Sequence, residues 1–224
     1  MILLTVLVEG NTEEAFVKSV LAPHLGARSV YATPIKYETS RSAAGRRYKG
    51  GGLQWPGVYK QVREFLRDPR PEYRLTTLFD LYRLPSDFPG MDSHATVTNT
   101  AERAGHLESA MATAVGDARF LPYVQRHEFE TLVLACLDQL EASDPAKRAG
   151  IKKLRADIGG APPEDVNDGA NTAPSKRLER FVDGYRKVLD GPDVTARAGL
   201  AALRVACPRF GAWLTRLESL SGAP

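Results

Sequence analysis

The hydrophobic residues at the start of the chain form a short unbroken run that stops at an acidic residue. Residues 2–8 read ILLTVLV, and Glu9 follows directly. A continuous aliphatic and β-branched run of this length is typical of a central strand covered on both faces. Beyond it the apolar positions recur at helical spacing, with two glutamates in the first turn. The pattern predicts a strand, a tight turn and a helix over residues 12–25.

The alternation of strand and helix patterns continues to about residue 140. The further predicted strands are 30–37, 74–79 and 120–130, and the further predicted helices are 58–66, 98–115 and 130–140. Residues 81–94 are predicted to be an ordered loop, because they carry two prolines, a glycine and repeated Asp and Ser. Strands that alternate with helices in this way predict a mostly parallel sheet, joined by right-handed crossovers and flanked by helices.

The pattern changes after Ser143, where helices replace strands. Helical periodicity covers residues 145–157, 175–189, 193–205 and 208–220, and a loop rich in Gly, Pro, Asn and Asp spans 159–174. A chain of 224 residues is long enough for one α/β domain with a helical appendage. We therefore predict an α/β domain over residues 1–142 and a helical C-terminal part over 143–224 that packs on it.

The composition excludes several classes of protein. With 43% hydrophobic and 25% charged residues, neither a disordered chain nor a membrane protein is indicated. The first apolar run lacks the basic flank of a signal peptide, so we expect a cytoplasmic protein without a membrane partner. Cys136 and Cys207 lie in apolar helical contexts, which favours buried thiols over disulfides or a zinc site. The net charge of +3 is a weak bias.

Acidic residues follow the predicted strands. Glu9 ends the first, Asp80 the third, and Glu128 and Glu130 the fourth. The ligand crevice of an open parallel sheet lies outside the carboxyl ends of its strands, so these acids would converge there. Hard oxygen ligands favour Mg²⁺ or Mn²⁺, metals that mostly serve phosphate chemistry. Any one of the acids is equally well explained as a helix cap or turn former.

The tetrapeptide HEFE, residues 127–130, contains two glutamates, and one of them is the better candidate for a metal ligand. Glu128 and Glu130 are separated by a single residue, so their side chains diverge by about 200° in a first helical turn. We rank Glu128 first as a ligand, and a plain helix start is the alternative. His127 is a candidate proton carrier because its ordinary pKa lies near neutrality, although a lone histidine is more often structural.

Two basic stretches are candidates for holding phosphate. RSAAGRRYKGGG, residues 41–52, contains Arg46, Arg47 and Lys49 with no acid between them, which suits a nucleic-acid backbone or, equally, a solvated loop. The second stretch has Lys176 and Arg177 at a predicted helix start, where backbone N–H groups favour phosphate. Simple helix capping with solvated cations is the alternative. No P-loop motif occurs, which argues against nucleotide hydrolysis.

Four motifs in order resemble a known bacterial family. They are VEGNTEEAFV, DLYRLPSDFPG, YVQRHEFETLV and NTAPSKRL. Together they resemble an uncharacterised Toprim-like family, known only as a domain of unknown function, whose members are often encoded beside an ATPase. The resemblance extends over nearly the whole chain. It implies a relation to the Toprim domain of topoisomerases, primases and OLD-type nucleases.

The resemblance implies roles for the strand-end acids. Glu9 matches the glutamate that serves as a general acid/base or metal ligand, and Asp80 matches the first residue of an Asp-x-Asp pair. Tyr82 stands where the second Asp is expected, and a neutral tyrosine is a poor Mg²⁺ ligand. Either Glu128 or Glu130 then completes the site, as a third acidic element does in OLD-type domains, or the metal site is weakened. Asp87 and Asp92 are alternatives.

The leading functional hypothesis is a Mg²⁺- or Mn²⁺-dependent phosphodiester hydrolase, a nuclease for which DNA is favoured over RNA as the substrate. Lys176 would contact the scissile phosphate. The resemblance adds an ATPase partner and a role in defence against phage. The alternative, for which Tyr82 is the main support, is an inactive Toprim fold that binds nucleic acid or a partner. A phosphatase or transferase for small phosphorylated molecules is third, and homo-oligomerisation is left open.

Overall fold

The core of the molecule is a parallel sheet. The computed structural model describes residues 1–37, 52–92, 99–166, 169 and 171–222. The strands are β1 (Ile2–Val8), β2 (Val30–Lys36), β3 (Tyr73–Asp80), β4 (Phe120–Leu121) and β5 (Val124–Gln125). Their order is β2-β1-β3-β4, and β5 also pairs with β3; all pairings are parallel. The predicted α/β class, a mostly parallel sheet flanked by helices, is confirmed.

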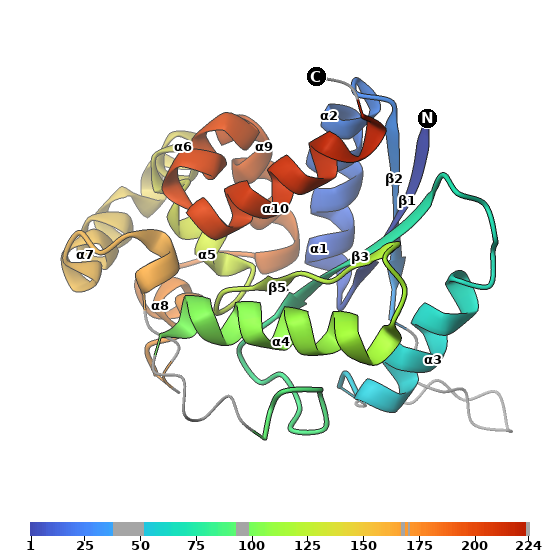
Figure 1. Ribbon diagram of the computed structural model, residues 1–224. Coiled ribbons are helices and arrows are strands. Elements are labelled where there is room, and N and C mark those ends of the chain that lie inside the picture. The colour runs from blue at the N-terminus through green and yellow to red at the C-terminus, as the bar shows by residue number, and fades with distance from the viewer. Residues whose placement is uncertain (38–51, 93–98, 167–168, 170, 223–224) are drawn as a thin grey trace, which may run out of the picture.

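Helices cover both faces of the sheet (Figure 1). The helical elements are α1 (Asn11–Phe16), η1 (Val17–Leu21), α2 (Ala22–Gly26), α3 (Trp55–Phe65), α4 (Thr100–Val115), α5 (Glu130–Leu134), α6 (Leu137–Ser143), η3 (Pro145–Lys147), α7 (Arg148–Ile158), η4 (Pro163–Asp165), α8 (Pro174–Phe181), α9 (Lys187–Ala206), α10 (Pro208–Glu218) and η5 (Ser219–Ser221). Helices α3 and α4 lie on one side, and α1 with the C-terminal helices lies on the other (Figure 1). None of the helices in the described ranges is long and apolar enough to cross a membrane.

The central strand distributes its side chains to two hydrophobic cores. Val6 and Val8 belong to the core beneath α1 and the C-terminal helices, whereas Leu7 belongs to the core beneath α3 and α4. This division follows from the two-residue period of a strand. Phe16 of α1 packs edge-on against Phe129 and Phe210, with ring centroids 5.5 and 6.0 Å apart. Residues before and after Ser143 therefore share one continuous core.

The predicted fourth strand over residues 120–130 is wrong in its length. Pairing is limited to two dipeptides, β4 and β5, because Pro122 between them has no N–H to donate to the sheet. The hydroxyl of Thr77 bridges the gap: it donates to the Tyr123 carbonyl and accepts the Tyr123 N–H, both at 2.8 Å. The chain then leaves the sheet, and His127 adopts a left-handed backbone with φ of 65°. Glu128 and Glu130 consequently lie in a turn and a helix start.

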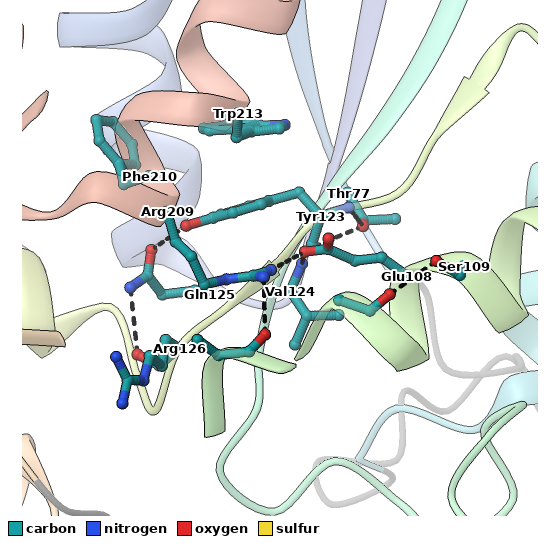
Figure 2. Close-up of polar contacts among 12 residues, drawn as sticks. Thr77, Glu108, Ser109, Tyr123, Val124, Gln125, Arg126, Arg209, Phe210 and Trp213 are labelled. Carbon is teal, nitrogen blue, oxygen red and sulfur yellow. Dashed lines mark hydrogen bonds and ion pairs between the residues drawn. The ribbon is translucent and has the colours of Figure 1, made fainter. Parts of the chain in front are cut away.

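Polar contacts fasten this edge of the sheet to α4 and α10 (Figure 2). The ring of Tyr123 stacks on Trp213 with centroids 4.5 Å apart. Glu108 accepts the N–H of Val124 at 2.9 Å and forms an ion pair with Arg209. Because Arg209 belongs to α10 and Glu108 to α4, these two helices hold the short strand in place from two sides.

Several predicted helices are divided or shifted. The helix predicted over residues 12–25 contains the π-helical turn η1, next to Pro23, which cannot donate to the carbonyl of Ser19. The helix predicted over 130–140 breaks at Cys136. The helix predicted over 175–189 ends at Phe181, and the chain turns through Gly184 at φ of 71°. Helix α9 begins earlier than predicted and is kinked at Gly199.

Candidate functional site

Glu9 and Asp80 meet at the carboxyl ends of the two central strands. Strands β1 and β3 are neighbours, so the residues that end them lie side by side, and the Asp80 N–H donates to Glu9 Oε1 at 2.7 Å. Both residues line a cavity of about 330 Å³. Its lining consists of Glu9, Gly52, Leu53, Asp80, Tyr82, Arg83, Leu84, Pro85, Glu128, Ser175 and Lys176. The structure thus brings together four of the residues singled out from the sequence: Glu9, Asp80, Glu128 and Lys176.

The two strand-end carboxyls crowd each other. Glu9 is an exposed residue at the rim of the cavity lining, and desolvation of its carboxyl group by the nearby protein raises its pKa to about 7. The Asp80 N–H opposes the shift and the charge of Glu13 adds to it. The pKa of Asp80 is raised well above its ordinary value, first by burial and then by Glu9. Asp80 Oδ1 is buried and accepts no hydrogen bond within the described part of the chain.

The raised pKa of Glu9 determines how the stability of the protein depends on pH. A carboxyl group whose pKa is higher in the folded protein than in the unfolded chain lowers the free energy of unfolding once it ionises. For Glu9 this loss of stability grows as the pH rises from about 4.5 to about 7. We expect Glu9→Gln to become increasingly more stable than the wild type over this range, without metal. Urea unfolding at a series of pH values measures the difference.

Glu14, in the helix that follows Glu9, supplies a matched control for the pH dependence of stability. Hydrogen bonds from Lys18 and Lys36 lower the pKa of Glu14, so its ionised form stabilises the fold, and this contribution is lost as the pH falls through its folded pKa. Glu14→Gln should therefore show the opposite pH dependence from Glu9→Gln. The same trend in both variants would contradict the assignment of the effect to Glu9.

Glu13 is a site residue that the sequence did not reveal. The sequence pattern predicts a favourable charge in the first helical turn, yet Glu13 is buried, and its charge raises the pKa of both Glu9 and Asp80. A Cβ placed on Gly10 would lie 3.1 Å from Glu13 Oε2, so the turn passes close to the carboxylate. The available signal was the four-residue spacing from Glu9 across a single turn.

The two glutamates of HEFE have different surroundings. Glu128 lines the cavity and accepts two hydrogen bonds from Ser175, from the N–H at 2.9 Å and from the hydroxyl at 3.0 Å. Glu130 is fully buried and forms an ion pair with Lys187, 2.9 Å from Nζ to Oε2. Burial raises the pKa of Glu130, and Lys187 opposes that shift. Glu128 is therefore the better placed of the two to meet a ligand.

Two cationic residues line the same cavity as the carboxylates. Lys176 lies in the first turn of α8 and Arg83 in the loop after β3. The pKa of Lys176 is raised, chiefly by its hydrogen bond to Glu179, and nearby Arg83 opposes the rise. Arg83 has a left-handed backbone with φ of 62°, which costs energy for a residue with a side chain. Its guanidinium stacks over the ring of Tyr82, which also lines the cavity.

The remaining predicted residues lie elsewhere. His127 is buried, and its Nε2 is 3.0 Å from the Glu164 carbonyl, away from the cavity lining. Arg177 pairs with Asp157 and donates to the Thr172 carbonyl. The predicted phosphate-gripping residues Arg46, Arg47 and Lys49 fall outside the described residues. Asp87 accepts the N–H of Trp55, and neither Asp87 nor Asp92 lines the cavity where the structure describes it.

The donor chemistry at the cavity suits Mg²⁺ or Mn²⁺. Glu9 and Asp80 present carboxylate oxygens side by side, and Asp80 Oδ1 has an unused acceptor position. Within the described ranges no group of three or more His, Cys, Asp or Glu side chains is arranged to hold a metal ion. Mg²⁺ commonly uses only one or two carboxylates and completes its octahedron with water and substrate phosphate. The pair therefore fits such an ion better than it fits zinc.

The chain was compared with known proteins. Two solved structures of the C-terminal region of the OLD protein of Xanthomonas campestris pv. campestris are similar at 14% identity, with TM-scores of 0.40 and 0.42. The matches cover 95% and 98% of this chain and 94% and 96% of those chains. The comparison with curated proteins gave no match. A family model, described as a domain of unknown function (DUF4276), matches residues 8–218, so the chain belongs to the DUF4276 family.

Proposed function

We propose that this protein is a Mg²⁺- or Mn²⁺-dependent phosphodiester hydrolase that cuts nucleic acid. The observation that carries the proposal is the pairing of Glu9 and Asp80 at one wall of a cavity that Lys176 and Arg83 also line. Two crowded carboxylates with raised pKa values favour a divalent cation, because the ion offsets their mutual repulsion. The adjacent cations suit the negative charge of a phosphate.

The polar residues that line the cavity near the strand ends have defined tasks in this proposal. Glu9 and Asp80 would hold the metal, which neutralises charge on the phosphate and lowers the pKa of a bound water. Lys176 and Arg83 bind the phosphate oxygens and stabilise the charge that builds up on them. Ser175 orients the carboxylate of Glu128 toward the cavity through its two hydrogen bonds. The first turn of α8 adds backbone N–H groups to the same region.

The biological setting extends the proposal. The motif resemblance to Toprim-like proteins supports DNA as the substrate, an ATPase encoded nearby as the partner and defence against phage as the role. A cytoplasmic location belongs to the same proposal. The second candidate is a catalytically inactive subunit that binds nucleic acid, and it is favoured by Tyr82, whose neutral side chain lines the cavity where an Asp would add a ligand.

Calorimetric titration with Mn²⁺ tests the proposal directly. We expect saturable binding to the wild type that is lost in Glu9→Gln and Asp80→Asn, because each variant removes one of the two paired carboxylates. Glu14→Gln is the matched control, since Glu14 pairs with Lys18 and Lys36 away from the cavity, and it should bind as the wild type does. Failure of the wild type to bind would favour the inactive subunit, which binds nucleic acid in a salt-dependent but metal-independent way.

A further inference from the structure

Lys187 places a positive charge among the acids of the site. It is the first residue of α9, and its ammonium lies 2.9 Å from Glu130 Oε2. Glu130 is fully buried, and its other oxygen, Oε1, accepts no hydrogen bond within the described residues. A carboxylate in this position requires a cation, because burial of an unpaired charge is costly. Within the described ranges, Lys187 is the cation paired with it.

Tight packing holds the start of α9 against the acidic site. A Cβ placed on Gly191 would lie 3.2 Å from Phe129 and 3.5 Å from Thr12. Thr12 belongs to the helix that follows Glu9, and Phe129 lies between the two glutamates of HEFE. The glycine therefore allows α9 to approach both acidic segments closely. Lys187, one turn earlier on the same helix, is positioned by this contact.

The influence of Lys187 reaches beyond Glu130. Its charge lowers the pKa of Glu9 and of Asp80, against the larger effects of burial that raise both values. The pKa of Lys187 itself is raised: burial disfavours its charge, and Glu130, Asp80 and Glu13 together outweigh that effect. The ammonium thus interacts with Glu9, which follows β1, and with acids of α1, β3 and α5.

We propose that the Lys187 ammonium occupies the place of a second metal ion, so that the site takes a single divalent cation. Many enzymes of phosphate chemistry hold two ions roughly 4 Å apart on shared carboxylates. In this protein the carboxylates divide into two groups. Glu9 and Asp80 line the cavity, whereas Glu130 does not line it and is paired with Lys187. The inference rests on the proposed function, because it presupposes that Glu9 and Asp80 hold a divalent ion.

The number of bound Mn²⁺ ions per chain tests this inference. Calorimetry should give one ion for the wild type and two for Lys187→Met, in which Glu130 is left without its cation. The double variant Lys187→Met/Glu130→Gln removes both charges and should return to one. Lys176→Met is the matched control: it removes another lysine near the site, one that pairs with Glu179, and should leave the number at one. Lys187→Gln keeps a hydrogen-bond donor for Glu130 and replaces the methionine variant if that protein does not fold.

The outcomes separate the inference from the proposed function. Two ions in the wild type, or one ion in the wild type and in the folded Lys187 variants alike, would overturn the role of Lys187 and leave the metal-dependent function intact. No binding by the wild type would overturn both. A second ion that persists in the double variant would show that Glu130 is not its ligand and would also reject the substitution of Lys187 for a metal.

Discussion

Replacement of Asp80 by asparagine is expected to lower metal-dependent cleavage at least about 10²-fold, the order found when one group that stabilises transition-state charge is removed. Asp80 presents a buried, unpartnered oxygen beside Glu9, and an amide is a much poorer ligand for a hard cation than a carboxylate. The measurement is the rate at which single- and double-stranded DNA and RNA are cut in the presence of Mn²⁺, for the wild type and the variant.

The same variant is expected to be more stable than the wild type when no metal is present. The amide removes a charge that burial and Glu9 disfavour, so at pH 8 the free energy of unfolding should rise on the order of 1 kcal/mol. Denaturant unfolding measures it. Asp87→Asn is the control, since Asp87 accepts a backbone N–H outside the cavity and should neither slow cleavage nor gain stability. An Asp80→Asn protein that cleaves more slowly and is also less stable than the wild type would point to a folding defect instead of a lost metal ligand.

Phe16→Ala is expected to lower the free energy of unfolding by about 3–5 kcal/mol, as for other large aromatic residues truncated in a core. The Phe16 ring is fully buried. It contacts Phe129, which lies between Glu128 and Glu130, and Phe210 of α10. Its loss opens a cavity at the junction of the sheet and the C-terminal helices. Chemical denaturation followed by both tryptophan fluorescence and circular dichroism measures the change.

The two spectroscopic signals also report whether the chain unfolds as a unit. Trp213 lies in the C-terminal helices and Trp55 in α3, so fluorescence samples both sides of the sheet. Coincident transitions are expected, because one core spans both parts. Tyr31→Ala is the control: this residue is largely exposed on the edge strand, and its loss should change stability by no more than about 0.5 kcal/mol. Separate transitions would instead support two independent units.

The sheet was predictable because hydrophobic periodicity decides it. The run over residues 2–8 and the strand that ends at Asp80 carry enough β-branched and aliphatic residues to specify buried parallel strands. The fourth strand was overpredicted, because one proline and a hydroxyl from a neighbouring strand decide where the pairing breaks. Such a contact joins residues far apart in sequence, and a local pattern does not contain it.

The candidate site was predictable in part for the same reason. Residues at the ends of neighbouring parallel strands must meet, so Glu9 and Asp80 followed from topology alone. Glu13, Arg83 and Lys187 did not follow, because their places depend on a tight turn, a left-handed backbone and the packing of a distant helix. The family resemblance, not the periodicity, drew attention to Lys176. The structure places Lys176 in the lining of the cavity.

The last part of the acidic site to be synthesised is α9. A nascent chain exposes Glu9 and Asp80 early, but the ammonium of Lys187 joins them only after the loop that follows α8 has left the ribosome. Until then the buried position of Glu130 has no cation, and the sheet lacks the helices that cover one of its faces. Assembly of the acidic site is thereby tied to the synthesis of α9, which follows the strands that carry Glu9 and Asp80 along the chain.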